Sequence, residues 1–251
     1  MKWRNRVVIV CLAGQLAAIA QSGDASFQSA LRELAAQNYA AALPHLEQAV
    51  AADPENVRYS NEYRQAAIQA KEYDRAVTFF EKLVADHPAS ANTHLNYGFA
   101  FVDKIPAAGS ISQVILASNA LTEFSKTVEL NPSWIAYYTR GSSYLFWPKV
   151  FNRTRLGVAD LQHAMDLQAA DRKHRSYYVR TYIALGDAYW KGDEFAKAAA
   201  TWEAGLKAFP DSTALKQRLS LTGEQLKTFM DETYDPSKRV NTDLKELWSD
   251  Q

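Results

Sequence analysis

The residues best suited to chemistry in this sequence are its five histidines, His45, His87, His94, His163 and His174. An imidazole can bind a metal ion or transfer a proton near neutral pH. Metal sites need ligands at fixed spacings such as HExxH, and no such spacing occurs here. The GxxxxGK loop that binds phosphates, the GxGxxG of dinucleotide sites and the GxSxG of serine hydrolases are also missing. The sequence therefore predicts no enzyme, no metal site and no cofactor.

Charge and composition narrow the class of partner. The 28 Lys and Arg residues balance 28 Asp and Glu residues, so the chain has no basic field to attract a nucleic acid. Acidic and basic residues alternate, as in Lys71-Glu72 and Asp74-Arg75, which is typical of solvated helix faces. With 47% hydrophobic and 22% charged residues, we expect an ordinary globular protein without nucleic-acid binding.

The N-terminal residues have the pattern of a secretory signal peptide. Basic residues precede an apolar run over residues 7–20, and the run ends in small side chains that a signal peptidase accepts. We expect residues 1–20 to be a signal peptide cleaved between Ala20 and Gln21. The alternative is an uncleaved anchor in the inner membrane, for which the run is short.

Cleavage would also remove Cys11, the only cysteine of the chain. The mature chain would then form no disulfide. A cysteine-free exported chain favours a bacterial envelope location, so we expect a periplasmic or secreted protein that is not inserted in the membrane after cleavage.

The most regular stretch is Val179–Ser212, which contains two runs with helical apolar periodicity. Gly186 and Ala198 are small where two helices of a hairpin would cross, whereas Phe195 and Trp202 are large where the next layer must be filled. This stretch resembles the tetratricopeptide repeat, a unit of 34 residues. At a shift of 34 residues the same types recur earlier in the chain: Tyr39 and Tyr73, Ala42 and Ala76, Leu46 and Phe80, Pro54 and Pro88.

The resemblance implies an all-α fold, a right-handed superhelical solenoid of antiparallel helix pairs with about five repeats and C-terminal capping helices. We expect a repeat domain over residues 21–222, followed by a capping helix and docked tail over residues 223–251. In the last helix of the repeat domain, over residues 213–221, Leu215 and Leu219 should face the stack and Arg218 should face water. In the tail, Leu244, Leu247 and Trp248 should lie on the docking side.

Two repeats have long interhelical loops, near residues 105–114 and 147–153. In the third repeat, Val114 continues the apolar stripe of the second helix, which predicts that this helix begins early, near Ser112. Insertions in such repeats often mark a binding face, and aromatic residues beside arginine suit an interface. Trp147, Phe151 and Arg153 are therefore predicted to contact a partner. The alternative is that Trp147 and Phe151 fold back over the early turns of that helix.

The resemblance also implies that the first helix of each repeat lines a concave groove that binds partners. Projected onto this chain, the groove positions are Asn61, Gln65, Phe99, Tyr138, Phe146, Asp187 and Trp190. Apolar and aromatic residues replace most of the set with which chaperone-cofactor members hold a C-terminal carboxylate, so that ligand is not expected. The alternative for the groove aromatics is that they pack on neighbouring helices or on the long loops.

These observations predict a non-enzymatic scaffold or adaptor of the bacterial cell envelope, which binds a peptide segment or a partner protein in its groove. The alternative function is an accessory or assembly factor for a specific exported enzyme or envelope complex. In that case the loops near 105–114 and 147–153 would make the contact and the groove would be occupied by the chain itself.

Overall fold

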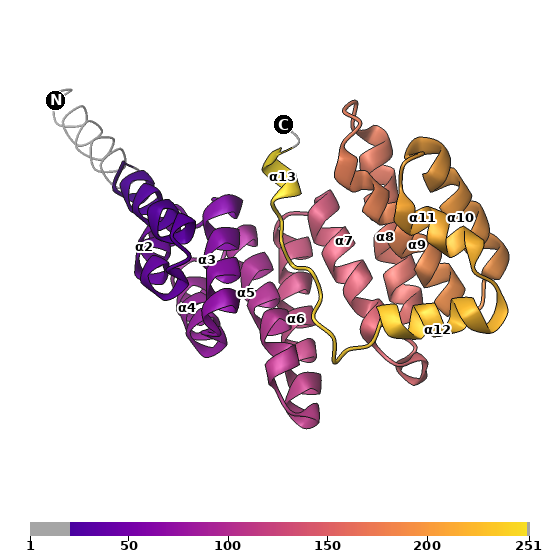
Figure 1. Ribbon diagram of the computed structural model, residues 1–251, viewed down its shortest axis with the longest axis horizontal. Coiled ribbons are helices and arrows are strands. Elements are labelled where there is room, and N and C mark those ends of the chain that lie inside the picture. The colour runs from indigo at the N-terminus through magenta and orange to yellow at the C-terminus, as the bar shows by residue number, and fades with distance from the viewer. Residues whose placement is uncertain (1–20, 250–251) are drawn as a thin grey trace, which may run out of the picture. The chain divides into compact units, whose positions relative to one another are not determined.

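The computed structural model describes residues 21–249, so the predicted signal peptide and Ala20 lie outside the described residues, and Gln21 is the first residue described. The chain divides into two compact units. Unit 1 comprises the described residues up to Lys104 together with Thr242–Lys245, and unit 2 comprises Ile105–Asn241 with the residues from Glu246 onward. Both units are built from helices, and residues 21–249 contain no strand (Figure 1).

Unit 1 consists of helix pairs. Residues 21–35 are helical, and four helices follow: α2 (Tyr39–Ala52), α3 (Val57–Ala70), α4 (Tyr73–Asp86) and α5 (Ala91–Lys104). Each of the four has 14 residues. Helices α2 and α4 begin at Tyr39 and Tyr73, the pair that the 34-residue shift relates. Leu46 and Phe80, a second such pair, are fully buried in the core of this unit.

Unit 2 continues the pattern with longer connections. Its elements are η1 (Ile105–Ala107), α6 (Ser110–Leu130), α7 (Trp134–Ser143), η2 (Tyr144–Phe146), η3 (Lys149–Phe151), α8 (Thr154–Ala170), η4 (Ser176–Tyr178), α9 (Val179–Lys191), α10 (Phe195–Ala208), α11 (Thr213–Ser220), α12 (Gly223–Thr233) and α13 (Glu246–Ser249). Helices α7 and α8 pack on each other, as do α9 and α10. The expected all-α fold of antiparallel helix pairs is confirmed.

Small residues set the distance between α9 and α10. A Cβ atom on Gly186 would lie 2.2 Å from Nε1 of Trp202, so only glycine fits beside this indole. Ala198 is fully buried, as predicted. The prediction for Phe195 is wrong: it is the first residue of α10, and its side chain is 57% exposed. Its ring centre lies 6.3 Å from that of Trp190, which is half-buried.

The early start of α6 is confirmed, but its predicted stripe is wrong at Val114. The helix begins at Ser110, yet Val114 is exposed and the first buried side chain is that of Leu116. The first turn and a half of α6 thus makes little contact with the rest of the unit. Of the helices within the described residues, none combines the length and the apolar character that crossing a membrane requires.

The C-terminal helices cover the end of unit 2. Leu215 of α11 is fully buried and Leu219 packs against the same core, as predicted. Arg218 was expected to face water, and this is wrong: the side chain is buried. Its position follows from an ion pair with Asp187, which is described below.

Candidate partner-binding site

Arg64 of α3 is the centre of a buried polar cluster in unit 1, and the residue is 1% exposed. Its Nε donates a hydrogen bond to Asn96 Oδ1 at 2.9 Å, and its Nη1 donates to Asp103 Oδ2 at 2.9 Å. Its Nη2 donates to Asn61 Oδ1 at 3.1 Å. Burial lowers the pKa of Arg64, and the charge of Asp103 opposes that shift. A buried cation left without its anion is costly, so this pairing holds the cluster in one arrangement.

The chain's own segment Thr242–Lys245 contacts this cluster within unit 1. Arg64 Nη2 donates to the Thr242 carbonyl at 3.0 Å, and the Thr242 hydroxyl donates to Asp103 Oδ1 at 2.5 Å. Asn61 binds the segment twice: its Nδ2 donates to Asp243 Oδ1 at 2.9 Å, and its Oδ1 accepts from the Leu244 N–H at 2.9 Å. The predicted groove residue Asn61 is therefore occupied by the chain itself.

Two other predicted groove residues, Phe99 and Gln65, lie on the same two helices as this cluster. The Phe99 side chain is buried, and the guanidinium carbon of Arg64 is 4.7 Å from the centre of its ring, a cation–π contact. Gln65 is half-buried, and its Nε2 has no hydrogen-bond partner among the described residues. Asn61 and Phe99 thus meet at Arg64, while Gln65 lies one helical turn from Asn61 on α3, and the binding of these residues to a partner stays a prediction.

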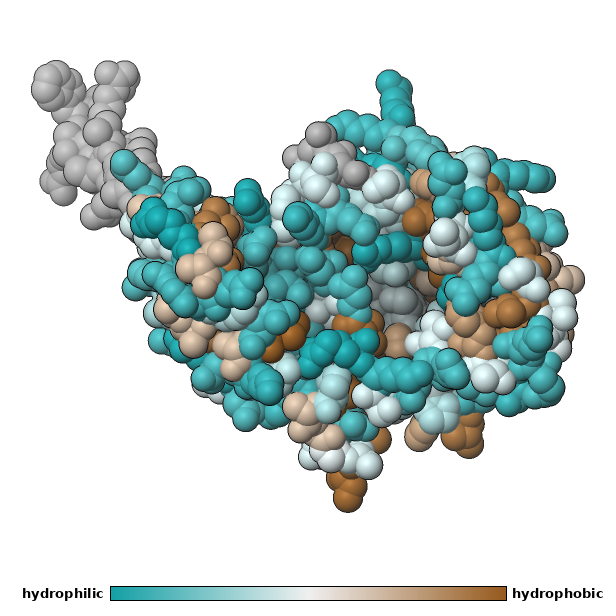
Figure 2. Space-filling model, in the orientation of Figure 1, coloured by the Kyte–Doolittle hydropathy of each residue, from teal (hydrophilic) through white to brown (hydrophobic). Residues whose placement is uncertain are grey.

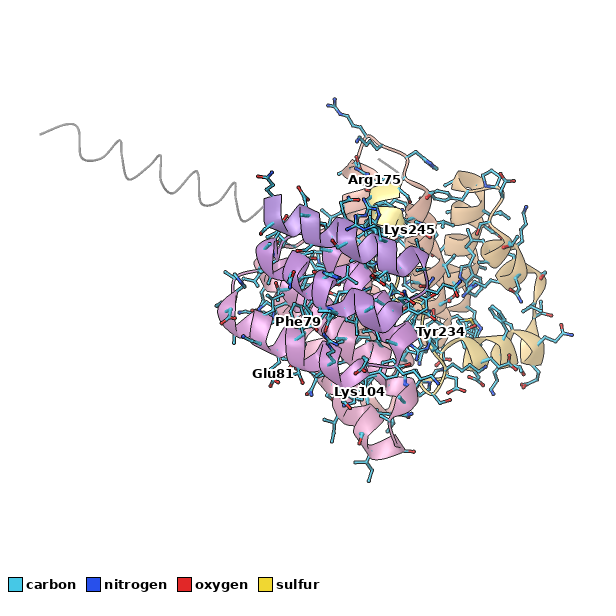
Figure 3. All side chains as sticks on the ribbon, turned by 60° about the vertical axis from the view of Figure 1, so that its left-hand side comes forward. Phe79, Glu81, Lys104, Arg175, Tyr234 and Lys245 are labelled. Atoms are coloured by element: carbon cyan, nitrogen blue, oxygen red, sulfur yellow. The ribbon has the colours of Figure 1, made fainter. Side chains whose placement is uncertain are left out.

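Asp187 of α9 is the corresponding centre in unit 2, and it is fully buried. Arg218 of α11 holds both of its oxygens, with Nε at 2.6 Å from Oδ1 and Nη2 at 2.7 Å from Oδ2. Trp202 Nε1 donates to Oδ1 at 3.1 Å, and the hydroxyl of Tyr234 (Figure 3) donates to Oδ2 at 2.6 Å. Burial and the Asp187 charge raise the pKa of Tyr234 well above its usual value. With four hydrogen bonds accepted, Asp187 is not presented to a partner in this structure.

The predicted aromatic positions of unit 2 are packed. Tyr138 stacks on Trp134 with ring centres 5.0 Å apart and an angle of 3° between the rings, and burial raises the pKa of Tyr138. Phe146 packs edge-on against Tyr234 with ring centres 5.2 Å apart. Trp190 is half-buried. The alternative that these aromatic residues pack on their neighbours therefore describes Tyr138 and Phe146.

The loop near 147–153 differs from the prediction in one residue. Trp147 is only 7% exposed, because the Arg153 guanidinium covers its face at 3.7 Å from the ring centre and Phe151 packs against it. Trp147 therefore does not project into solvent, and its contact with a partner stays a prediction. Phe151 remains 54% exposed, and the neighbouring Val150 is more exposed still.

Large apolar side chains gather at two connections of unit 2 with little cover. Ile111, Val114 and Ile115 belong to the start of α6. Val150 and Phe151 belong to the connection between α7 and α8, and Leu156 belongs to the first turn of α8. Figure 2 shows apolar atoms projecting at two separate places along the lower edge of this unit, one near each of the two connections drawn in Figure 1. We call these six residues the apolar edge.

The histidines do not converge on a site. His94 is buried with its Nε2 at 3.1 Å from the Pro88 carbonyl, and His163 and His174 lie against the rings of Tyr137 and Phe209. Within residues 21–249, no group of three or more His, Cys, Asp or Glu side chains is placed to hold a metal ion.

Sequence reasoning missed the residues that organise both clusters, namely Arg64 with Asp103 and Arg218 with Tyr234. A signal existed for Arg64, because the repeat pattern has a small residue at that place in the first helix. The side chain of an arginine at that position must either point into solvent or pair with a buried anion. In this structure it pairs with Asp103. No comparable local signal marks Arg218, whose partner lies 31 residues earlier in the chain.

Comparison with known proteins agrees with this architecture. Models of the tetratricopeptide repeat match residues 33–95 and residues 183–228. A tetratricopeptide repeat protein of Thermus thermophilus has a similar fold, with a TM-score of 0.56 at 18% identity over 79% of this chain and 97% of that one. A second one, from Parabacteroides merdae, gives 0.57 at 11% identity over 92% and 80%. None of the curated proteins compared with the sequence matches it.

A third similar structure is MamA from Desulfovibrio magneticus, with a TM-score of 0.53 at 18% identity over 78% of this chain and 99% of that one. At such identities the likeness concerns the fold. Helix pairs, a 34-residue period in unit 1 and small residues where helices cross define a helical repeat scaffold. Residues 33–95 and 183–228 of the chain belong to the tetratricopeptide repeat family, and the fold of the described residues is that of tetratricopeptide repeat proteins.

Proposed function

We propose that the protein is a non-enzymatic adaptor of the bacterial cell envelope that contacts a protein partner through the apolar edge. The tetratricopeptide fold is a scaffold for protein–protein interaction, and the family membership supports that general role. Of the two binding modes expected from the sequence, the geometry favours contact through the inserted loops, with the groove positions occupied by the chain itself.

The observation that carries this choice is the exposure of the apolar edge. Ile111 is 82% exposed, with Val114 and Ile115 exposed on the next turn of α6, and Val150 is 85% exposed beside the exposed Phe151. Single exposed apolar residues are ordinary, but a group of them on one surface marks an interaction site. Arg153, stacked on Trp147 beside them, adds a cation of the kind found at interface anchors. A partner with a complementary apolar surface would remove this group from water.

Two of the groove positions also favour binding at the apolar edge, because their side chains already have partners within the chain. Asn61 already binds Asp243 and Leu244, and Asp187 already binds Arg218 and Tyr234. A partner that used these side chains would first have to displace part of the chain. The apolar edge needs no such displacement.

A photocrosslinking experiment tests the proposal with a matched control. A benzophenone amino acid is placed at Phe151 or at Phe195, which are 54% and 57% exposed and both lie in unit 2. In the envelope fraction we expect a discrete adduct from position 151 and none from position 195. Equal labelling from both positions, or an adduct with the mass of two copies of this chain, would contradict the proposal.

The envelope location rests on the basic and apolar pattern of residues 1–20, and it is tested separately. The intact mass of protein isolated from its native cells should correspond to a chain that begins at Gln21. A mass that includes residues 1–20 would instead favour the membrane-anchored alternative.

A further inference from the structure

The segment Thr242–Lys245 is bound to unit 1 in the way that a peptide ligand is bound. It has no helical structure, and its residues 242–244 contact polar side chains of α3 and α5 through the hydrogen bonds described above. Two of these bonds use the backbone, at the Thr242 carbonyl and the Leu244 N–H. Two others use side chains, at the Thr242 hydroxyl and the Asp243 carboxylate.

This combination selects a ligand by both shape and chemistry. Contacts to the backbone require an extended segment but accept any sequence, whereas contacts to side chains discriminate between residues. Asp103 accepts from a hydroxyl at the first position, and the Asn61 amide donates to a carboxylate at the second. The third side chain, Leu244, is buried. The site therefore fits a hydroxyl residue, an acidic residue and an aliphatic residue in that order.

The receptor side of this contact also has hydrogen bonds of its own that do not involve the segment. Arg64 is paired with Asp103 and bonded to Asn96 within α3 and α5, and Asn96 Nδ2 in turn donates to Asn92 Oδ1 at 2.9 Å. A prearranged receptor costs little ordering entropy when it binds. The segment contributes one buried aliphatic side chain, while the residues on either side, Asn241 and Lys245, are exposed. The segment can therefore dissociate from α3 and α5 without exposing the hydrophobic core of unit 1.

We propose that this face of α3 and α5 is a binding site for an extended segment of a partner protein with the order hydroxyl, acidic, aliphatic, and that Thr242-Asp243-Leu244 occupies it when no partner is bound. Because the segment is tethered, it has a high effective concentration at the site, and a partner segment must compete with it. This inference is independent of the apolar edge, which lies in unit 2.

The probe is a fluorescent peptide with the sequence of residues 239–248, RVNTDLKELW, titrated by anisotropy against three full-length chains. These are the wild type, a release variant with Thr242→Val and Leu244→Ser, and a control variant with Val240→Ser, which changes an exposed residue. We expect the release variant to bind the peptide about 10-fold or more tightly than the wild type and the control, because apparent affinity falls with the fraction of sites that are free.

The peptide's own sequence provides the specificity control. A peptide in which Thr-Asp-Leu is replaced by Val-Ala-Ser should bind the release variant about 10-fold more weakly or worse, and a Gly/Ser-rich peptide that carries only Ser-Asp-Leu should retain binding. Equal binding of all peptides, or equal binding by the release variant and the wild type, would overturn the proposal.

Two measurements on the wild type guard against a release variant that folds poorly. An excess of the unlabelled peptide should accelerate exchange of the Leu244 amide proton, because the segment is displaced; an unchanged rate would overturn the proposal. Light scattering should give a monomer. A dimer that becomes monomeric in the release variant would mean that the site takes the tail of a second copy, which also overturns the proposal.

Discussion

Each unit binds one part of the chain's C-terminal region around a buried ion pair, but the two arrangements are built differently. In unit 2, Asp187 is held by Arg218, a side chain of helix α11, and by Tyr234 directly after α12. In unit 1, the pair of Arg64 and Asp103 is complete within α3 and α5, and the irregular segment around Thr242 binds to it from outside.

The difference shows that similar polar contacts can serve a permanent cap or an exchangeable ligand. The polar contacts to Asp187 are accompanied by core packing, since Leu215 of α11 and Met230 of α12 are buried. The contacts to Arg64 are accompanied by one aliphatic side chain, Leu244. Removing α11 and α12 would expose the core of unit 2 and leave Asp187 without its cation, whereas removing the segment from unit 1 leaves the ion pair intact.

The largest effect should come from Asp187→Ala. The substitution leaves Arg218 buried without its anion and removes the acceptor of Trp202 and Tyr234. Breaking a buried pair in this way costs about 3–5 kcal/mol. Urea unfolding followed by tryptophan fluorescence should show this loss. An unfolding free energy within about 1 kcal/mol of the wild type would mean that the cluster does not hold the cap.

Tyr234→Phe is a milder change at the same cluster. It removes a hydroxyl that donates to a buried carboxylate at 2.6 Å and keeps the ring that packs on Phe146. A hydrogen bond to a charged group contributes about 1.5–3 kcal/mol, so the unfolding free energy should fall by about that amount. The same urea titration measures this loss of unfolding free energy. An unchanged urea midpoint would show that the hydrogen bond from Tyr234 to Asp187 does not contribute to stability.

Thr242→Val makes the matched change in unit 1 and should have the smallest effect. The hydroxyl of Thr242 also donates to a buried carboxylate, that of Asp103. If the segment opens locally, water can replace the lost donor, and the cost to global unfolding should stay below about 1 kcal/mol. Its effect should appear instead as faster amide exchange at Leu244. A global loss as large as that of Tyr234→Phe would make the segment a structural part of unit 1.

The sequence predicted what depends on local spacing. The 34-residue shift placed Tyr39 and Tyr73 at equivalent positions, and both begin helices. The small side chain at Gly186 follows from the same pattern and is confirmed by its contact with Trp202. The periodicity of the sequence indicates which face of a helix is apolar, but it does not indicate which turns of that face are buried by neighbouring helices. This is why Phe195 and Val114, each near the start of a helix, were assigned to the core and are exposed.

The candidate site depends on pairs that no local pattern contains. Arg64 and Asp103 are 39 residues apart, and Asn61 and Leu244 are 183 residues apart. Asn61 was predicted to be a groove position, and the residues that its side-chain amide binds, Asp243 and Leu244, lie near the other end of the chain. Arg218 was assigned to water because polar residues on a terminal helix usually face it, and only the position of Asp187 in space explains its burial.

Amide hydrogen exchange of the wild-type protein, read residue by residue by NMR, tests the central claim most directly. The Leu244 N–H, which is bonded to Asn61, should exchange through local opening, about 100-fold or more faster than the N–H groups of α11 that are bonded within the helix. This result would show that the segment leaves unit 1 while unit 2 keeps its cap. Equal protection of Leu244 and α11, at the level of global unfolding, would contradict the claim that the site in unit 1 holds an exchangeable ligand.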